Sequence, residues 1–152
     1  MIKPRFMFYS MPKNLVLLLR YVFSKDKKGI ESRVARKFET IFSIKNIILV
    51  PQCRVGIYLA VKASLVDERD EFIVPAYTIY DVVNMILGGG GRPVFCDVKR
   101  GTANIDPGAI KKCITSKTRA VIVPHLHGLS ADLSEIRAVC DENNVLLIED
   151  VV

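Results

Sequence analysis

Short runs of apolar, β-favouring residues alternate with helical stretches along most of this 152-residue sequence. The expected strands are NIILV (46–50), EFIVP (71–75), PVFCDV (93–98), RAVIVP (119–124) and VLLIE (145–149). The helical stretches between them begin near Val55, Ile79, Pro107 and Asp132. Strands that are apolar throughout and are separated by helices are typical of a mainly parallel sheet with both faces covered. We therefore predict a three-layer α/β fold.

The composition fits one globular domain, because half of the residues are hydrophobic and the charged fraction is average. The net charge of +6 is unevenly distributed, since residues 1–50 carry 11 Lys and Arg against 3 acidic residues. Residues 51–152 carry 11 basic against 13 acidic residues. The basic excess therefore belongs to the N-terminal segment, and the remainder shows no nucleic-acid-binding footprint.

The N-terminal segment is predicted to form two helices, PKNLVLLLRYVF (12–23) and IESRVARKFETIF (30–42), joined by the charged linker SKDKKG (24–29). The first is expected to be an amphipathic helix. Its apolar run is about half the length that spans a bilayer and it contains Arg20, so we predict no transmembrane segment. It also lacks the cleavage site of a signal peptide. A helix lying on a membrane surface is the alternative.

Four cysteines, Cys53, Cys96, Cys113 and Cys140, occur without any C-x-x-C pair. This pattern favours neither a zinc site nor a disulfide framework, so we expect no metal and a reducing, cytoplasmic location. The run GGGG (88–91) follows a helical stretch and precedes a strand, whereas phosphate-binding loops follow a strand and precede a helix. We predict that it ends the helix with a left-handed turn.

Polar and aromatic groups follow the expected strands. PQCRVG follows 46–50, AYTIYD follows 71–75, HLHG follows 119–124, and Asp150 ends the last strand. Parallel sheets bind ligands beyond the carboxyl ends of their strands, so these groups mark a candidate site. Ordinary polar loops at strand ends would give the same pattern, and a Rossmann-type or flavodoxin-like binding domain is a further alternative. PQCRVG does not match the G-x-G-x-x-G fingerprint of the Rossmann type.

The same segments carry a family resemblance. RPVFCDV followed by NIDP, then HLHG with AD shortly after, and finally LIED occur in an order that resembles the DegT/DnrJ/StrS family of sugar aminotransferases. The resemblance extends from about Gly29 to the last residue. It divides the chain into a basic extension, residues 1–28, and the front half of a large cofactor-binding domain, residues 29–152.

The resemblance implies a fold-type-I enzyme that uses pyridoxal 5'-phosphate and works as a homodimer. It implies transfer of an amino group, usually from glutamate, to a keto-sugar carried on a nucleotide. Asp150 matches the family's aspartate that pairs with the pyridine nitrogen. A carboxylate there keeps that nitrogen protonated, so the ring can accept electrons.

The other cofactor-binding residues that the resemblance implies are less typical of the family. Cys53 and Arg54 replace the usual Gly-Thr pair, although the helix start from Cys53 to Val55 still offers N–H groups to a phosphate. Ile79 stands where an aromatic ring usually packs on the cofactor, with Tyr80 as a possible substitute. His125 matches the histidine of the family's H-L-Y-G pattern.

The family's Schiff-base lysine lies in a Ser-x-x-Lys context beyond the Glu-Asp motif, whereas this sequence ends two residues after Asp150. Lys62, Lys111 and Lys112 lie in helical stretches and are expected to be solvated. We therefore expect this chain to be the front part of the enzyme and to be inactive alone. A dehydratase of the same family and a degenerate, non-catalytic interaction domain are the alternatives.

Overall fold

The computed structural model describes residues 11–151, and the chain divides into two compact units, Met1–Leu49 and Val50–Val152. The N-terminal unit contains α1 (Met11–Val22) and α2 (Lys27–Phe42), so both predicted helices are confirmed. Helix α2 begins three residues before the predicted start, because the side chain of Asp26 accepts a hydrogen bond from the N–H of Gly29. The end of the expected linker is therefore helical.

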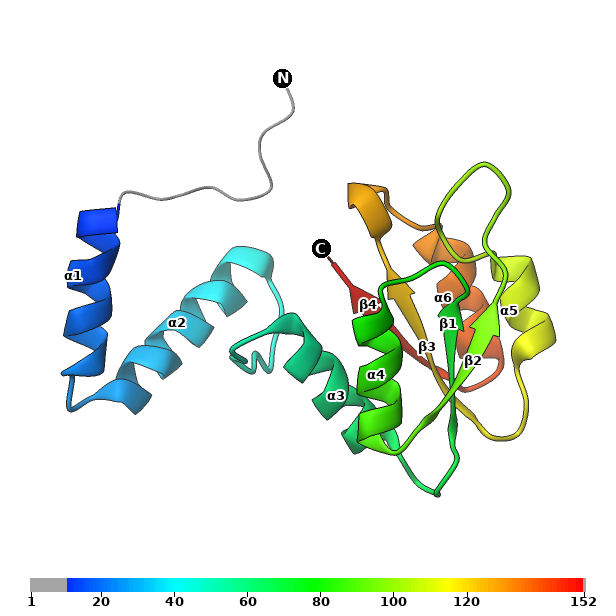
Figure 1. The fold of residues 1–152 in the computed structure, drawn as a ribbon, viewed down its shortest axis with the longest axis horizontal. Coiled ribbons are helices and arrows are strands. Elements are labelled where there is room, and N and C mark those ends of the chain that lie inside the picture. The colour runs from blue at the N-terminus through cyan, green and yellow to red at the C-terminus, as the bar shows by residue number, and fades with distance from the viewer. Residues whose placement is uncertain (1–10, 152) are drawn as a thin grey trace. The chain divides into compact units, whose positions relative to one another are not determined.

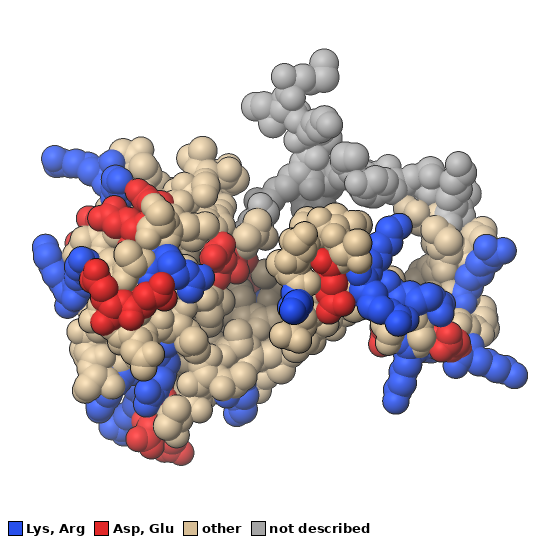
Figure 2. All heavy atoms as spheres, turned by 180° about the vertical axis from the view of Figure 1, so that it is seen from behind, with Lys and Arg blue, Asp and Glu red and all other residues tan. Residues whose placement is uncertain are grey.

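The two N-terminal helices bury little of their apolar surface within their own unit. The residues from Leu15 to Leu19 are each 45–60% exposed, and α2 has no buried residue. Figure 2 shows lysine and arginine side chains prevailing over this unit, whereas both signs of charge are mixed over the other one. Within residues 11–151, no helix has the length and apolar character needed to cross a bilayer.

The predicted strand at residues 46–50 does not form, and this part of the sequence prediction was wrong. Asn46 has a left-handed φ of 62°, and the side chain of Ile48 is 79% exposed. The segment pairs with no strand among the described residues. An apolar composition is insufficient here, because a strand is stable only when a neighbour pairs with its backbone groups.

The C-terminal unit is a four-stranded parallel sheet in the order β2-β1-β3-β4 (Figure 1). Its strands are β1 (Glu71–Pro75), β2 (Arg92–Cys96), β3 (Thr118–Pro124) and β4 (Leu146–Asp150). Its helices are α3 (Cys53–Ser64), α4 (Tyr80–Gly89), α5 (Pro107–Cys113), the short η1 (Leu126–Gly128) and α6 (Leu133–Glu142). The four other predicted strands and all four helical stretches are thus confirmed.

Strand β2 ends two residues before its predicted end. Residues 93–98 were expected to form one strand, but the chain leaves the sheet after Cys96. Val98 instead forms an isolated antiparallel bridge with Ile105, which closes the loop before α5. Val98 is therefore part of this loop and not of the sheet.

Two apolar clusters cover the two faces of the sheet, because successive side chains of a strand point to opposite sides. Ile73, Val121 and Val123 pack on one side with residues of α5 and α6. Phe72 and Val74 pack on the other side with residues of α3 and α4. Figure 1 shows the two helix layers on either side of the sheet. This arrangement confirms the three-layer prediction and explains why the strands are apolar throughout.

The run of four glycines ends α4 as predicted. Gly90 has a left-handed φ of 99°, and its N–H donates to the carbonyls of Ile86 and Leu87. The next residue, Gly91, lies against the ring of Phe72, where an added Cβ would come within 2.5 Å of a ring carbon. The turn thus needs one glycine for its conformation and the next for a close approach.

Buried acidic residues at the amino edge of the sheet are paired. The side chain of Asp70 accepts hydrogen bonds from Arg119 Nε at 2.8 Å and from the N–H groups of Val66 and Asp67. These contacts, with Arg119 the first cause, lower the pKa of Asp70 to about 2. Glu71 at the start of β1 forms an ion pair with Arg92 at 2.6 Å. We assign this edge a structural role, since each buried carboxylate has partners.

Candidate active site

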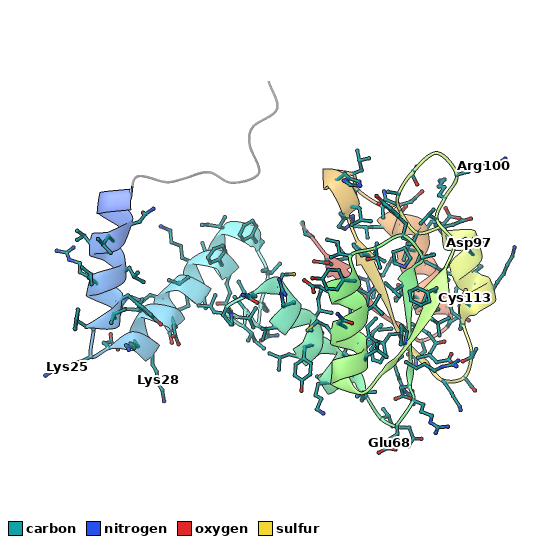
Figure 3. The ribbon with its side chains drawn as sticks, viewed as in Figure 1. Lys25, Lys28, Glu68, Asp97, Arg100 and Cys113 are labelled. Atoms are coloured by element: carbon teal, nitrogen blue, oxygen red, sulfur yellow. The ribbon has the colours of Figure 1, made fainter. Side chains whose placement is uncertain are left out.

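The candidate site lies at the carboxyl edge of the sheet, where parallel α/β sheets bind their ligands. Figure 3 shows the two edges: Glu68 marks the amino edge, and Asp97 and Arg100 lie beyond the carboxyl end of β2. A cavity of about 340 Å³ opens at the carboxyl edge. It is lined by Gln52, Cys53, Arg54, Ile57, Ile79, Asp81, Val82, Asp150 and Val151. The starts of two helices and the end of β4 therefore form its walls.

Asp150 is the buried carboxylate of this cavity, with a residue exposure of only 6%. Its Oδ1 accepts a hydrogen bond from the Cys53 thiol at 3.1 Å. Burial, as the largest cause, together with the hydrogen bond to Asp150 and its charge, raises the pKa of that thiol to about 11. The thiol is therefore protonated at neutral pH and serves as a donor to Asp150. The other carboxylate oxygen has no partner among the side-chain contacts of the described residues.

Arg54 forms an ion pair with Asp81, with its NH1 group 3.1 Å from Asp81 Oδ2. Arg54 belongs to the first turn of α3 and Asp81 to the first turn of α4. Neither helix start has a side-chain cap, because Gln52 and Ile79 at the two N-cap positions make no such hydrogen bond. The first N–H groups of a helix have no partner inside it, and they favour anions. Two such helix starts therefore face one cavity.

Of the site residues predicted near the two helix starts, some line the cavity and others do not. Ile79 lines the cavity, as expected for a residue that packs on a ligand. Tyr80 is 72% exposed and is not among the lining residues. Val55 does not line the cavity, and its N–H donates to the carbonyl of Gln52 at 3.0 Å. The N–H groups nearest to the cavity are consequently those before Val55.

His125 is not among the residues that line the cavity, but it contacts Asp150 through the backbone. Its backbone N–H donates to the Asp150 carbonyl at 3.0 Å, and its ring Nδ1 accepts from the N–H of Ala131 at 3.1 Å. The residue is 7% exposed and does not line the cavity. The acceptor role of Nδ1 leaves Nε2 as the protonated nitrogen of the neutral ring. His127, by contrast, is exposed and lies 6.3 Å from the ring of Tyr77.

The sequence analysis did not single out five residues that line this cavity: Gln52, Ile57, Asp81, Val82 and Val151. A signal for Asp81 was present in the sequence, since the helix dipole stabilises an acidic residue at the start of a helical stretch. Sequence reasoning named Cys53 only as a departure from a pattern, and its contact with Asp150 joins residues 97 positions apart. Among the residues that the structure describes, no group of three or more His, Cys, Asp or Glu side chains could hold a metal ion.

Residues 27–152 match the model of the DegT/DnrJ/EryC1/StrS aminotransferase family. The chain is 33% identical over 134 residues to the L-glutamine:2-deoxy-scyllo-inosose aminotransferase of Streptomyces kanamyceticus, covering 86% of this chain and 31% of that protein. It is 34% identical over 118 residues to the GDP-perosamine synthase of Vibrio cholerae, covering 75% of this chain and 32% of that protein. The chain thus spans about a third of the length of these curated relatives.

A solved structure of the E. coli GDP-4-keto-6-deoxy-D-mannose-3-dehydratase with bound hydrated pyridoxal phosphate is also similar. Its TM-score is 0.70 at 25% sequence identity, covering 78% of this chain and 32% of that one. The three-layer unit described above therefore has the α/β architecture of a fold-type-I large domain.

Proposed function

The chain belongs to the DegT/DnrJ/EryC1/StrS aminotransferase family, whose members use pyridoxal phosphate, and from this we propose that the whole protein is a pyridoxal-phosphate-dependent sugar aminotransferase. Its substrate would be a keto-sugar carried on a nucleotide, and its amino donor would be of the glutamate type. The observation that carries the proposal is the buried Asp150 carboxylate at the end of β4, facing a cavity with two uncapped helix starts.

The described residues fit the cofactor at both of its polar ends. Asp150 would hold the pyridine nitrogen, and the starts of α3 and α4 together with Arg54 would hold the phosphate. Ile79 offers an apolar surface to the ring, although it lacks the stacking contribution of an aromatic side chain, about 1 kcal/mol. The cofactor, when bound, supplies an electron-accepting ring to the reaction.

The residues of this chain would act as binding and orienting groups. The Cys53 thiol donates a hydrogen bond to the Asp150 carboxylate, and the backbone N–H of His125 donates one to the Asp150 carbonyl, so both the side chain and the backbone of Asp150 are held in place. A fixed and buried carboxylate remains where the nitrogen needs it without reorganisation. The lysine that would anchor the cofactor is expected beyond Asp150, and we propose that the 152-residue chain does not transaminate alone.

The test is a titration of the protein expressed from its complete gene with pyridoxal phosphate, followed by absorbance and equilibrium dialysis. Asp150→Asn should weaken binding by about 10- to 100-fold, since a hydrogen bond to a charged group contributes about 1.5–3 kcal/mol. Asp97→Asn is the matched control, because Asp97 is an exposed acidic residue at the same edge that does not line the cavity. Equal affinity of the wild type and Asp150→Asn would contradict the proposal.

A dehydratase is the second candidate function, favoured by the similarity to the E. coli enzyme. The two reactions differ in the fate of nitrogen. With ¹⁵N-labelled glutamate and a nucleotide-linked keto-sugar, an aminotransferase leaves the label on the sugar product, whereas a dehydratase leaves none. Mass spectrometry of the sugar product therefore separates the two functions.

We also propose, from the family resemblance, that the complete protein is a homodimer and that residues 1–28 form an extension before the large domain. Size-exclusion chromatography with light scattering would test the first proposal. Removal of residues 1–28 without loss of cofactor binding would support the second.

A further inference from the structure

Both carboxylates of the cavity are paired with the first two side chains of α3. Asp150 accepts from Cys53, and Asp81 pairs with Arg54 at 3.1 Å. Among the described residues that line the cavity, Arg54 is the one cation. The positive charge that would attract an anion is therefore already matched by a charge of the protein itself.

The position of Asp81 explains why this pair forms. Arg54 lies at a helix start, where a positive charge is unfavourable, and the first turn of α3 contains no acidic residue. Asp81 belongs to the first turn of α4, where a negative charge is favourable. The side chain of Asp81 is 24% exposed and that of Arg54 51%, so solvent screens the pair only partly. The negative charge of Asp81 thus offsets the positive charge of the Arg54 guanidinium and the partial positive charges of the two helix starts.

We propose that Asp81 is an internal counter-ion with which an entering phosphate group must compete for Arg54. This inference rests on the proposed function, since it assigns the phosphate end of the cofactor to the starts of α3 and α4. A phosphate monoester dianion carries twice the charge of the carboxylate and displaces it. A singly charged anion gains little by the exchange, so the charge of Asp81 lowers the affinity of the cavity for anions.

The ion pair joins the NH1 group of Arg54 to Oδ2 of Asp81. A guanidinium has five N–H donors, so donors remain for an anion that approaches from the cavity. The competition therefore concerns charge more than hydrogen-bonding capacity. Removal of the Asp81 charge should strengthen phosphate binding, whereas a residue that merely held Arg54 in position would have the opposite effect.

The experiment measures the affinity of the protein from its complete gene for inorganic phosphate and, separately, for pyridoxal phosphate. Asp81→Asn should bind inorganic phosphate about 3- to 10-fold more tightly than the wild type, and formate should also bind more tightly but by a smaller factor. Asp81→Ser, which keeps a side-chain oxygen at the α4 start, should behave alike and covers the case in which the first variant folds poorly. Asp97→Asn should change neither affinity more than about twofold.

Unchanged or weaker phosphate binding in both Asp81 variants would overturn the inference, as would a lack of phosphate binding by every variant. The inference and the proposed function fail separately. If pyridoxal phosphate does not bind the wild type while Asp81→Asn still tightens phosphate binding, the counter-ion role is supported and the aminotransferase proposal is not.

Discussion

The thiol of Cys53 should react unusually slowly with alkylating reagents, because its pKa is raised from 9.0 to about 11. This higher pKa lowers the thiolate fraction at pH 8 about 100-fold, and only the thiolate is nucleophilic. The more basic thiolate is intrinsically more nucleophilic, with a Brønsted coefficient of about 0.4–0.5, which restores about tenfold. We therefore expect alkylation at pH 8 about tenfold slower than that of an unperturbed thiol.

The assay is a time course with iodoacetamide at several pH values, in which the modified Cys53 peptide is quantified by mass spectrometry. The pH dependence separates the pKa from simple steric protection, because protection lowers the rate equally at every pH. The rate should rise about tenfold per pH unit up to about pH 10 without levelling. Although the thiol is partly desolvated beside Asp150, the Cys53 residue is exposed, so the reagent has access to it.

Asp150→Asn provides the matched variant. The substitution removes the negative charge beside the thiol but leaves the burial, which is the larger cause of the raised pKa. The alkylation rate at pH 8 should therefore increase several-fold, whereas Asp97→Asn should leave it unchanged. A rate that levels at or below pH 9 in the wild type would refute the reasoning, and so would an Asp150→Asn rate equal to that of the wild type.

Two further predictions concern stability. Gly91→Ala should lower the free energy of unfolding by about 1–3 kcal/mol, because the added Cβ would meet the Phe72 ring at 2.5 Å. Gly88→Ala, in α4 with no atom within 4 Å of the added Cβ, should raise it by up to about 1 kcal/mol, and urea unfolding of both variants checks the pair. The folded-state pKa of Asp70 is depressed from 3.8 to about 2, so its stabilising contribution is present above pH 3.8 and is lost as the pH falls toward 2. Arg119→Met should flatten the acid-unfolding profile in this window, and an unchanged profile would contradict the pairing.

Most of the fold could be predicted from the sequence because local patterns and tertiary environment agree. Strands with two covered faces are apolar throughout, and four of them were found on that basis. Helices were predicted to begin near Pro107 and Asp132, and the N-cap residues Asp106 and Asp132 each accept a hydrogen bond from a backbone N–H of the following turn. At these positions the residues that determine the local structure are neighbours in the sequence.

The features that could not be predicted depend on contacts between residues that are distant in the sequence. Residues 46–50 have the composition of a strand, but the outcome depended on a pairing partner that no local pattern specifies. The contact between Arg54 and Asp81 joins residues 27 positions apart. Arg54 was predicted to bind the cofactor, but no local pattern indicated that it pairs with Asp81. The sequence indicated the edge of the sheet at which the site lies, but not which side chains meet there.

The start of α3 reaches this edge without a preceding strand, and helix packing accounts for it. Near the end of α3, Val61 lies so close to Gly89 that an added Cβ would be 2.6 Å from a valine methyl carbon. At the start of α3, the NH1 group of Arg54 lies 3.1 Å from Oδ2 of Asp81. Seven residues separate the two contacts along α3 and eight along α4, which at about 1.5 Å per residue gives nearly equal lengths. The helices therefore run side by side in the same direction, and both uncapped starts must face one cavity. Gly89 thus helps to define the candidate site, although it lies about 12 Å along α4 from Asp81.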